Sequence, residues 1–280
     1  MKLAVHAGFV SILLLGTACN SKFNFEDMPP NYGQESISIP PSESYVCDPF
    51  DSGRKAGDHN GVVGHLHYLD STMPHYTSVH DYIQFGNPVD DVILFINRLF
   101  VPTRPFDRGF VTLGGDVLRT KSGDRLFEWF AVDMRTKLGL GSGDVAGDYQ
   151  LASISDDGSV LTLGAGSGAS ELINNDETHS TTMKCATQPV YFDATSRLPA
   201  KIEYFQGPRT HIALMLMWRP WPAGGPADPE CDQSGNDYFF DSTQNPSAPT
   251  AVYNGLLARG WKPMSAENFY LESGVVNPCD

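Results

Sequence analysis

The sequence has 280 residues and a formal net charge of −14, with 33 acidic side chains against 19 basic ones. This balance excludes the usual nucleic-acid-binding surface, because binding to phosphate backbones relies on a basic patch. Hydrophobic residues make up 41% of the chain, enough to bury the core of one globular domain. A negatively charged domain of this kind suits cations or neutral polar ligands.

The N-terminus predicts export from the cell. Lys2 is followed by a short apolar run, Phe9–Leu15, and then by Gly16-Thr17-Ala18-Cys19. The run is too short to cross a bilayer, so residues 1–18 have the pattern of a signal peptide. Small residues before a cysteine resemble the bacterial lipobox, although Gly16 stands where leucine is expected. We therefore expect Cys19 to be lipidated, with secretion after cleavage behind Ala18 as the alternative.

Residues 19–46 are predicted to form a tether behind this cysteine. The segment is polar, includes Pro29-Pro30 and Pro40-Pro41, and lacks apolar periodicity. Asn20 stands where an aspartate is associated with inner-membrane retention. We therefore expect an exported lipoprotein of a bacterial outer membrane or cell surface, attached to the membrane through its lipid alone.

Four further cysteines predict two disulfides, since an even number in an exported chain is typical of disulfide bonding. Three connectivities are possible. We favour Cys47 with Cys279, because the ends of a domain often lie close together, and this leaves Cys185 with Cys231. A zinc site built from all four is less favoured, because no two of them have ligand-type spacing.

Residues 47–280 have the pattern of an all-β domain, an antiparallel β-sandwich or barrel with short helical turns near the C-terminus. No alternation of strands and helices indicates a parallel sheet. Helical turns are expected at Ala251–Arg259 and Ser265–Phe269, and a long loop at Trp221–Pro249. The predicted strands are Val62–Tyr68, Val92–Val101, Phe127–Val132, Gly147–Ile154, Val160–Leu163, Lys201–Phe205 and His211–Trp218.

The segment Gly147–Leu163 is the most informative part of the chain. Apolar and polar residues alternate as in a half-buried strand, then Asp156-Asp157-Gly158 marks a turn before Val160 and Leu161 resume the pattern. Turn chemistry alone favours an acidic surface hairpin. Paired carboxylates at a strand end can also hold calcium, which takes several oxygen ligands.

Several segments, in their order along the chain, resemble the PA14 family. They are Gly61–Tyr68, Phe127-Glu128-Trp129-Phe130, Gly147-Asp148-Tyr149 with the Asp-Asp-Gly turn, Leu198–Phe205 and Ile212–Trp218. The resemblance covers roughly residues 62–218 and implies a PA14-like β-barrel.

The resemblance also implies a calcium site. In the sugar-binding members two adjacent aspartates, joined by a cis peptide, grip a calcium ion that holds the glycan. Asp156 and Asp157 would take this role here. Asn175 and Asp176 are the expected second group of oxygen ligands, because amide and carboxylate oxygens suit calcium.

We expect the partner to be a glycan or a cell-envelope polysaccharide. The residues expected to shape its binding are Gly164 and Gly166, at the tip after the return strand, and Trp221, between two prolines in the long loop. The resulting hypothesis is calcium-dependent carbohydrate binding in adhesion or recognition.

Other functions are less favoured by the sequence. Catalysis has no support from a Gly-x-Ser-x-Gly elbow or a His-Glu-x-x-His helix, and adjacent aspartates do not face each other across a substrate as glycosidases require. A zinc site at His65 and His67, with a further histidine, is a weak alternative. The main alternative is a non-catalytic scaffold lipoprotein that binds protein, without metal, around Trp261.

Overall fold

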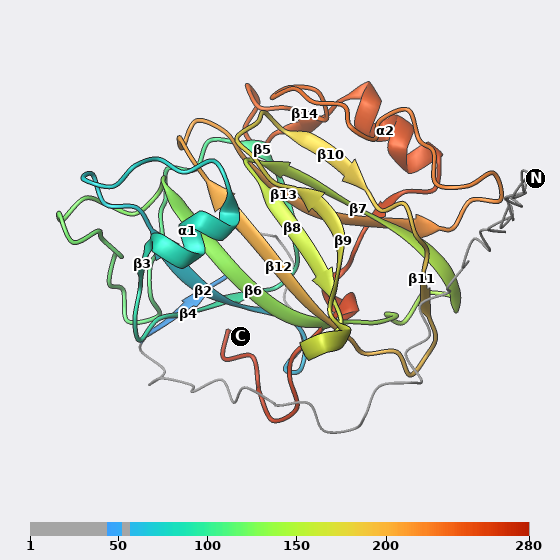
Figure 1. Ribbon diagram of the computed structural model, residues 1–280, viewed down its shortest axis with the longest axis horizontal. Helices are drawn as coiled ribbons and strands as arrows, with labels where there is room; N and C mark the ends of the chain where they lie inside the picture. The colour runs from blue at the N-terminus through green and yellow to red at the C-terminus, as the bar shows by residue number, and fades with distance from the viewer. Residues whose placement is uncertain (1–43, 52–56, 280) are drawn as a thin grey trace, which may run out of the picture. The chain divides into compact units, whose positions relative to one another are not determined.

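The computed structural model describes residues 44–51 and 57–279, so the signal peptide, Cys19 and most of the tether lie outside the described residues. The domain is built around two β-sheets (Figure 1). The first sheet has the order β1-β4-β2-β6-β12-β8-β9, with β3 paired to β2 and β17 to β6. Its strands are β1 (Tyr45–Cys47), β2 (Val62–Tyr68), β3 (Asn87–Pro88), β4 (Ile93–Ile96), β6 (Phe130–Leu138), β8 (Ser159–Leu163), β9 (Ser170–Asn175), β12 (Leu198–Gln206) and β17 (Phe269–Tyr270).

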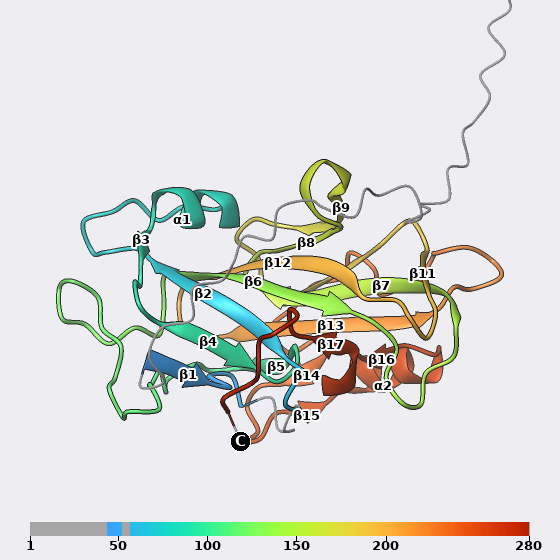
Figure 2. The ribbon, with the colours of Figure 1, turned by 90° about the horizontal axis from the view of Figure 1, so that it is seen from below.

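The second sheet has the order β10-β7-β13-β16, with β5 paired to β13 and β11 to β7. Its strands are β5 (Phe100–Arg104), β7 (Gly147–Asp156), β10 (Thr182–Cys185), β11 (Val190–Phe192), β13 (Ile212–Pro220) and β16 (Lys262–Pro263), and a small hairpin joins β14 (Phe240–Asp241) to β15 (Ala248–Pro249). Figure 2 shows the sheets as two layers, with β12 above β13. The predicted all-β class, a sandwich of largely antiparallel sheets, is confirmed.

β13 is apolar along almost its whole length because it is covered on both faces. It is buried on both faces from Ile212 to Arg219, because the other sheet covers one face and the C-terminal region covers the other. Met215 and Met217 pack in one cluster with Phe239 and Trp261. A strand that is covered on both faces has no need of alternating polarity. Trp261 is only 1% exposed, so its side chain belongs to the core, and protein binding by the segment around it stays a prediction.

The ends of the domain are joined by a disulfide. Cys47 pairs with Cys279, and Cys185 pairs with Cys231, with Cα–Cα separations of 5.5 and 5.6 Å. These are the pairings that the sequence favoured. Tyr45, which was assigned to the tether, is buried in β1, so the β domain begins before residue 47. β1 pairs in parallel with β4, an exception to the antiparallel pattern.

Helices are few and short. α2 (Ala251–Ala258) begins at the cap Thr250, and the 3₁₀ turn η4 (Ala266–Asn268) has a capping box between Ser265 and Asn268. Both lie where helical turns were expected. The 3₁₀ turn η3 (Gly166–Gly168) and the helix α1 (Val79–Phe85) were not predicted. No helix in the described part of the chain is long and apolar enough to cross a membrane.

Candidate functional site

The Asp156-Asp157-Gly158 turn connects the two sheets. Asp156 pairs with Ala213 in the second sheet, whereas Ser159 pairs with Tyr204 in the first. The expected hairpin is therefore wrong, because β7 and β8 pair with different neighbours. Gly158 makes the crossing possible: a Cβ atom there would lie 2.5 Å from a ring carbon of Phe205 and 2.7 Å from Oδ1 of Asp176.

Both aspartates of the turn are buried. Asp156 is 5% exposed and Asp157 is 4% exposed, and the peptide bond between them is cis. The Asp157 carboxylate accepts hydrogen bonds from the backbone N–H groups of Gly207 (2.7 Å) and His179 (3.2 Å). The Asp156 carboxylate accepts one from the Thr181 hydroxyl at 3.1 Å. Loops from two other parts of the chain therefore hold this pair.

Burial sets the protonation of the pair. It raises the pKa of Asp156 to about 7, and the negative charge of Asp157 adds to the shift. Burial also raises the pKa of Asp157, against the hydrogen bonds from Gly207 and His179. Within residues 44–51 and 57–279, neither carboxylate forms an ion pair with a basic side chain. A bound cation would favour the ionised form of both groups.

The two other expected calcium ligands lie beside the turn but have other partners. The Asn175 amide donates to the Ser155 hydroxyl (2.9 Å) and to the Thr182 carbonyl (3.1 Å). The Asp176 carboxylate accepts from the Ser78 hydroxyl (2.7 Å) and the Val79 N–H (2.9 Å), at the first turn of α1. Asp176 therefore caps a helix nearly 100 positions earlier in the chain, and such a long-range contact has no signature in sequence.

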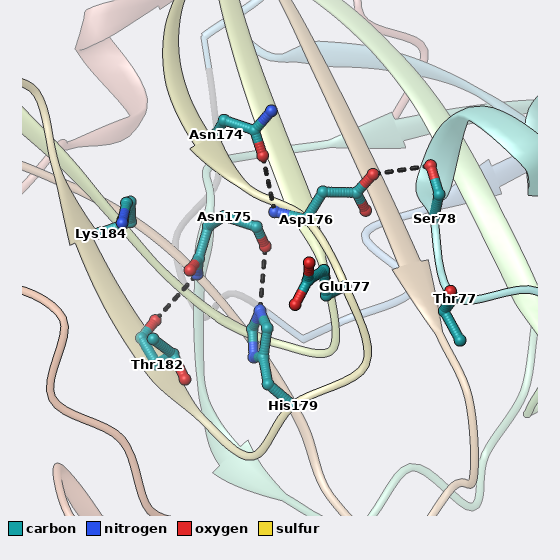
Figure 3. Close-up of a pocket in the computed structure, with 9 residues that line it drawn as sticks. All are labelled: Thr77, Ser78, Asn174, Asn175, Asp176, Glu177, His179, Thr182 and Lys184. Atoms are coloured by element: carbon teal, nitrogen blue, oxygen red, sulfur yellow. Dashed lines mark hydrogen bonds between the residues drawn. The ribbon is translucent and has the colours of Figure 1, made fainter.

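A polar cavity of about 630 Å³ adjoins this loop (Figure 3). In the figure the His179 ring points to the Asn175 carbonyl, and Ser78 points to Asp176. The lining residues are Thr77, Ser78, Asn174, Asn175, Asp176, Glu177, His179, Thr182 and Lys184. Donors and acceptors of this kind can bind a hydroxyl-rich molecule, and the lining includes two of the predicted site residues.

An aromatic side chain lies near Asp157, at Gly207: a Cβ atom added to Gly207 would lie 3.3 Å from a ring carbon of Trp129 and 2.9 Å from Oδ2 of Asp157. The backbone N–H of Trp129 donates to the Gly207 carbonyl at 3.1 Å, and the Gly207 N–H donates to the Asp157 carboxylate. The exposed ring of His75 stacks on Trp129, with centroids 3.5 Å apart and planes 13° from parallel. The sequence had placed Trp129 only in the Phe-Glu-Trp-Phe resemblance, without a role in the site.

The expected ligand-binding residues Gly164, Gly166 and Trp221 are not part of this site. β8 runs away from the Asp turn for five residues before Gly164, roughly 17 Å in a strand. Trp221 follows the end of β13 that pairs with Tyr149, seven positions and roughly 23 Å from the Asp156 pairing. The glycines were chosen because they follow the return strand, and Trp221 because its place between two prolines favours exposure; the strand directions carry both away from the aspartates.

The histidines of the weaker zinc hypothesis share one face of β2. His65 lies opposite Asp133 on β6, and burial lowers the pKa values of both His65 and His67. Among the described residues, no three or more His, Cys, Asp or Glu side chains are grouped so as to hold a metal ion.

No protein-family model matches the sequence, and no curated protein matches it. Some solved structures are distantly similar to this chain. An anti-sigma factor domain-containing protein from Clostridium clariflavum has 13% identity and a TM-score of 0.41, over 88% of this chain but only 52% of the other, so this chain spans about half its length. A PA14 sugar-binding domain from an RTX adhesin has 14% identity and a TM-score of 0.35, over 57% of this chain and 90% of the other. The A domain of epithelial adhesin 6 from Candida glabrata, solved with Galb1-3GlcNAc, has 17% identity and a TM-score of 0.38, over 75% and 98%.

Proposed function

We propose that this protein binds carbohydrate through a calcium ion held by Asp156 and Asp157. The observation that carries the proposal is the buried pair of adjacent carboxylates with no basic side chain in ion-pair contact among the described residues. Two buried carboxylates oppose each other's ionisation, and a divalent cation relieves that opposition. The oxygen donors at the turn are of the type that calcium prefers.

The contacts of the neighbouring loop define which residues would hold the ion. The carboxylates of Asp156 and Asp157 are the primary ligands in the proposal. Asn175 would ligate through Oδ1, since its hydrogen bonds to Ser155 and Thr182 are donated by Nδ2, and each Asp176 oxygen, which accepts one hydrogen bond at the first turn of α1, keeps a second lone pair. When bound, calcium supplies positive charge and open coordination positions for sugar hydroxyls.

The surroundings of the turn support a sugar as the ligand. Trp129 and the stacked ring of His75 offer an aromatic surface, on which the apolar face of a sugar ring can pack. The polar cavity beside Asn175 and Asp176 offers hydrogen-bonding groups for hydroxyls. Ligand sites in proteins commonly combine apolar contact area with a few placed polar groups.

Thermal unfolding with calcium and with a chelator tests the ion. An ion at about 100 times its dissociation constant should stabilise the wild type by roughly 2.7 kcal/mol. Asp157→Asn should lose this shift, while Asp148→Asn, an exposed aspartate at the far end of β7, should keep it. A calcium-dependent glycan screen of the same three proteins then tests the sugar.

The two disulfides fit an extracellular or cell-surface protein. We propose that Cys19 carries a lipid in a bacterial envelope and that the protein binds its ligand without catalysing a reaction.

Identical unfolding curves with and without calcium would reject the ion and favour the scaffold alternative. Mass spectrometry of the mature N-terminus would test the lipid.

A further inference from the structure

The segment between β5 and β6 forms two successive hairpins, drawn in green at the left of Figures 1 and 2. We call residues 110–126 the double hairpin. Its two turns repeat one arrangement. The backbone N–H of Thr112 donates to the Asp116 carbonyl, and that of Thr120 donates to the Asp124 carbonyl, each at 2.9 Å. In each turn the threonine hydroxyl also accepts from the aspartate N–H. Hydrogen bonds within each turn therefore fix the conformation of both tips.

The first hairpin exposes apolar side chains. Val111 is 41% exposed, Leu113 is 53% exposed, and Val117, which pairs with Val111, is 37% exposed. Three of the large apolar side chains that the described surface exposes thus lie within seven residues. Such a cluster is typical of a contact surface rather than of scattered exposure.

The second hairpin exposes cations. Arg119 and Arg125 lie directly opposite each other, and Lys121 occupies the same place in its turn as Leu113 in the first. None of the three forms an ion pair with an acidic side chain of the described residues. Like charges directly opposite on paired strands are destabilising, and an anionic partner would offset that cost.

The local charge differs from that of the whole chain. Residues 110–126, the double hairpin itself, contain three basic side chains and two acidic ones, a balance of +1 within a chain of −14. The acidic residues Asp116 and Asp124 are included in this balance. An acidic protein that keeps its unpaired cations beside exposed apolar groups matches a surface with anionic headgroups above an apolar layer.

The beginning of the described chain lies at the same place. The Leu113 N–H donates to the Tyr45 carbonyl at 2.7 Å. The described chain therefore begins beside the tip of the first hairpin, and the predicted lipid attachment at Cys19 precedes it in the sequence. An anchor at Cys19 would join the domain beside this hairpin, through 24 intervening residues.

We propose that the double hairpin docks on the surface of a phospholipid bilayer that contains anionic headgroups. Val111, Leu113 and Val117 enter the interface, and Arg119, Lys121 and Arg125 contact the headgroups. This surface is separate from the proposed calcium site and does not depend on it.

Vesicle flotation tests the proposal, using the chain from residue 19 onward with Cys19→Ser, so that neither the predicted signal peptide nor an attached lipid contributes. Vesicles of phosphatidylcholine alone are compared with vesicles containing phosphatidylglycerol. We expect binding to the anionic vesicles, weakened by salt because exposed charges are screened. Replacing Arg119, Lys121 and Arg125 by Gln should weaken it on the order of 100-fold, at about fivefold per cation. Leu113→Ser should weaken it roughly tenfold through lost apolar contact.

Matched controls separate the surface from general effects. Val145→Ser removes a 75% exposed apolar side chain before β7, and Arg197→Gln removes an exposed cation elsewhere; neither should change binding. Equal binding to neutral and anionic vesicles, or no binding to either, would overturn the proposal. So would a dimer in sedimentation that Leu113→Ser abolishes, or binding to soluble polygalacturonate, lost with the cations, in place of vesicle binding.

Discussion

Among the residues of the candidate site, Asp156 is the one whose titration should most clearly affect the free energy of unfolding. Burial raises its pKa to about 7 in the folded chain, against 3.8 for the ordinary group. The folded state therefore holds this proton more tightly between pH 4 and 7. The stabilisation is complete below about pH 4 and is lost as the pH rises through 7, at roughly 1.4 kcal/mol per unit of pKa shift.

We predict that, in chelator, the wild type loses stability toward urea between pH 5 and pH 8. Asp156→Asn should have a smaller loss over this range, because one of the two buried carboxyl groups no longer ionises. Asp148→Asn is the control, since that residue is exposed. An unchanged pH dependence in Asp156→Asn would contradict the buried, cation-free description of the pair.

The surroundings of Gly158 leave no space for a side chain at this position. Its added Cβ would approach both Phe205 and Asp176 to less than 3 Å. Gly158→Ala should therefore destabilise the fold by about 1–3 kcal/mol, the usual cost of overpacking, as measured by urea unfolding. Gly143→Ala is the matched control, because nothing lies within 4 Å of a Cβ there. Equal stability of the two variants would show that the turn can relax.

Elements with clear alternation were predictable from the sequence, and those held by distant contacts were not. Val62–Tyr68 was predicted with the bounds that it has, since buried and half-buried residues alternate near its end. The predicted strand Val92–Val101 is two strands, β4 and β5, which belong to different sheets. Periodicity along a chain carries no signal for a change of sheet.

Helix α1 and strand β9 were missed for a physical reason. α1 has seven residues, too few for a recognisable helical period, and its N-terminus depends on Asp176. β9 is largely exposed and polar. The cavity is lined by the end of β9 and by Thr77 and Ser78 just before α1, so the sequence could identify Asn175 and Asp176 but not the segment that Asp176 contacts.

The long loop after β13 is fixed by one buried carboxylate. Asp228 accepts hydrogen bonds from Arg219 (3.0 Å), Arg259 (2.9 Å) and the Trp261 ring N–H (3.0 Å). Burial opposes its ionisation, but these donors and the Glu230 N–H lower the pKa of Asp228 below its usual value. The residue therefore connects the loop to β13 and to the end of α2.

We predict that Asp228→Asn destabilises the fold by about 3–5 kcal/mol, because the buried Arg219 loses its carboxylate partner and keeps neutral acceptors such as Gln150 Oε1. The lowered pKa stabilises the folded state above the ordinary pKa, and this contribution is lost as the pH falls through the folded value. Unfolding at pH 7 and at pH 3 should show the smaller difference between variant and wild type at pH 3. Asp232→Asn, whose partner Lys184 is exposed, should change little at either pH.

At the scale of the molecule, the site exists because four strands bring their ends together. β7 ends and β8 begins at the aspartates, while β12 ends and β13 begins around the loop of Gly207. Residues about 50 positions apart thus meet at one end of the sandwich. The same strand directions carry Gly164 and Trp221 toward the other end, away from the aspartates.

The two disulfides close loops of very different length, with sequence separations of 232 and 46 residues. Because a disulfide reduces the entropy of the unfolded chain, the longer loop should stabilise the folded state by roughly 5 kcal/mol and the shorter one by roughly 4 kcal/mol. Replacing Cys47 and Cys279 by Ala should therefore destabilise the protein more than replacing Cys185 and Cys231, in reversible urea unfolding. Wild type unfolded in a strong reductant, which opens both loops, is the reference for the combined loss. A larger loss from the shorter loop would mean that native contacts near Cys231, rather than the entropy of the unfolded chain, determine the effect.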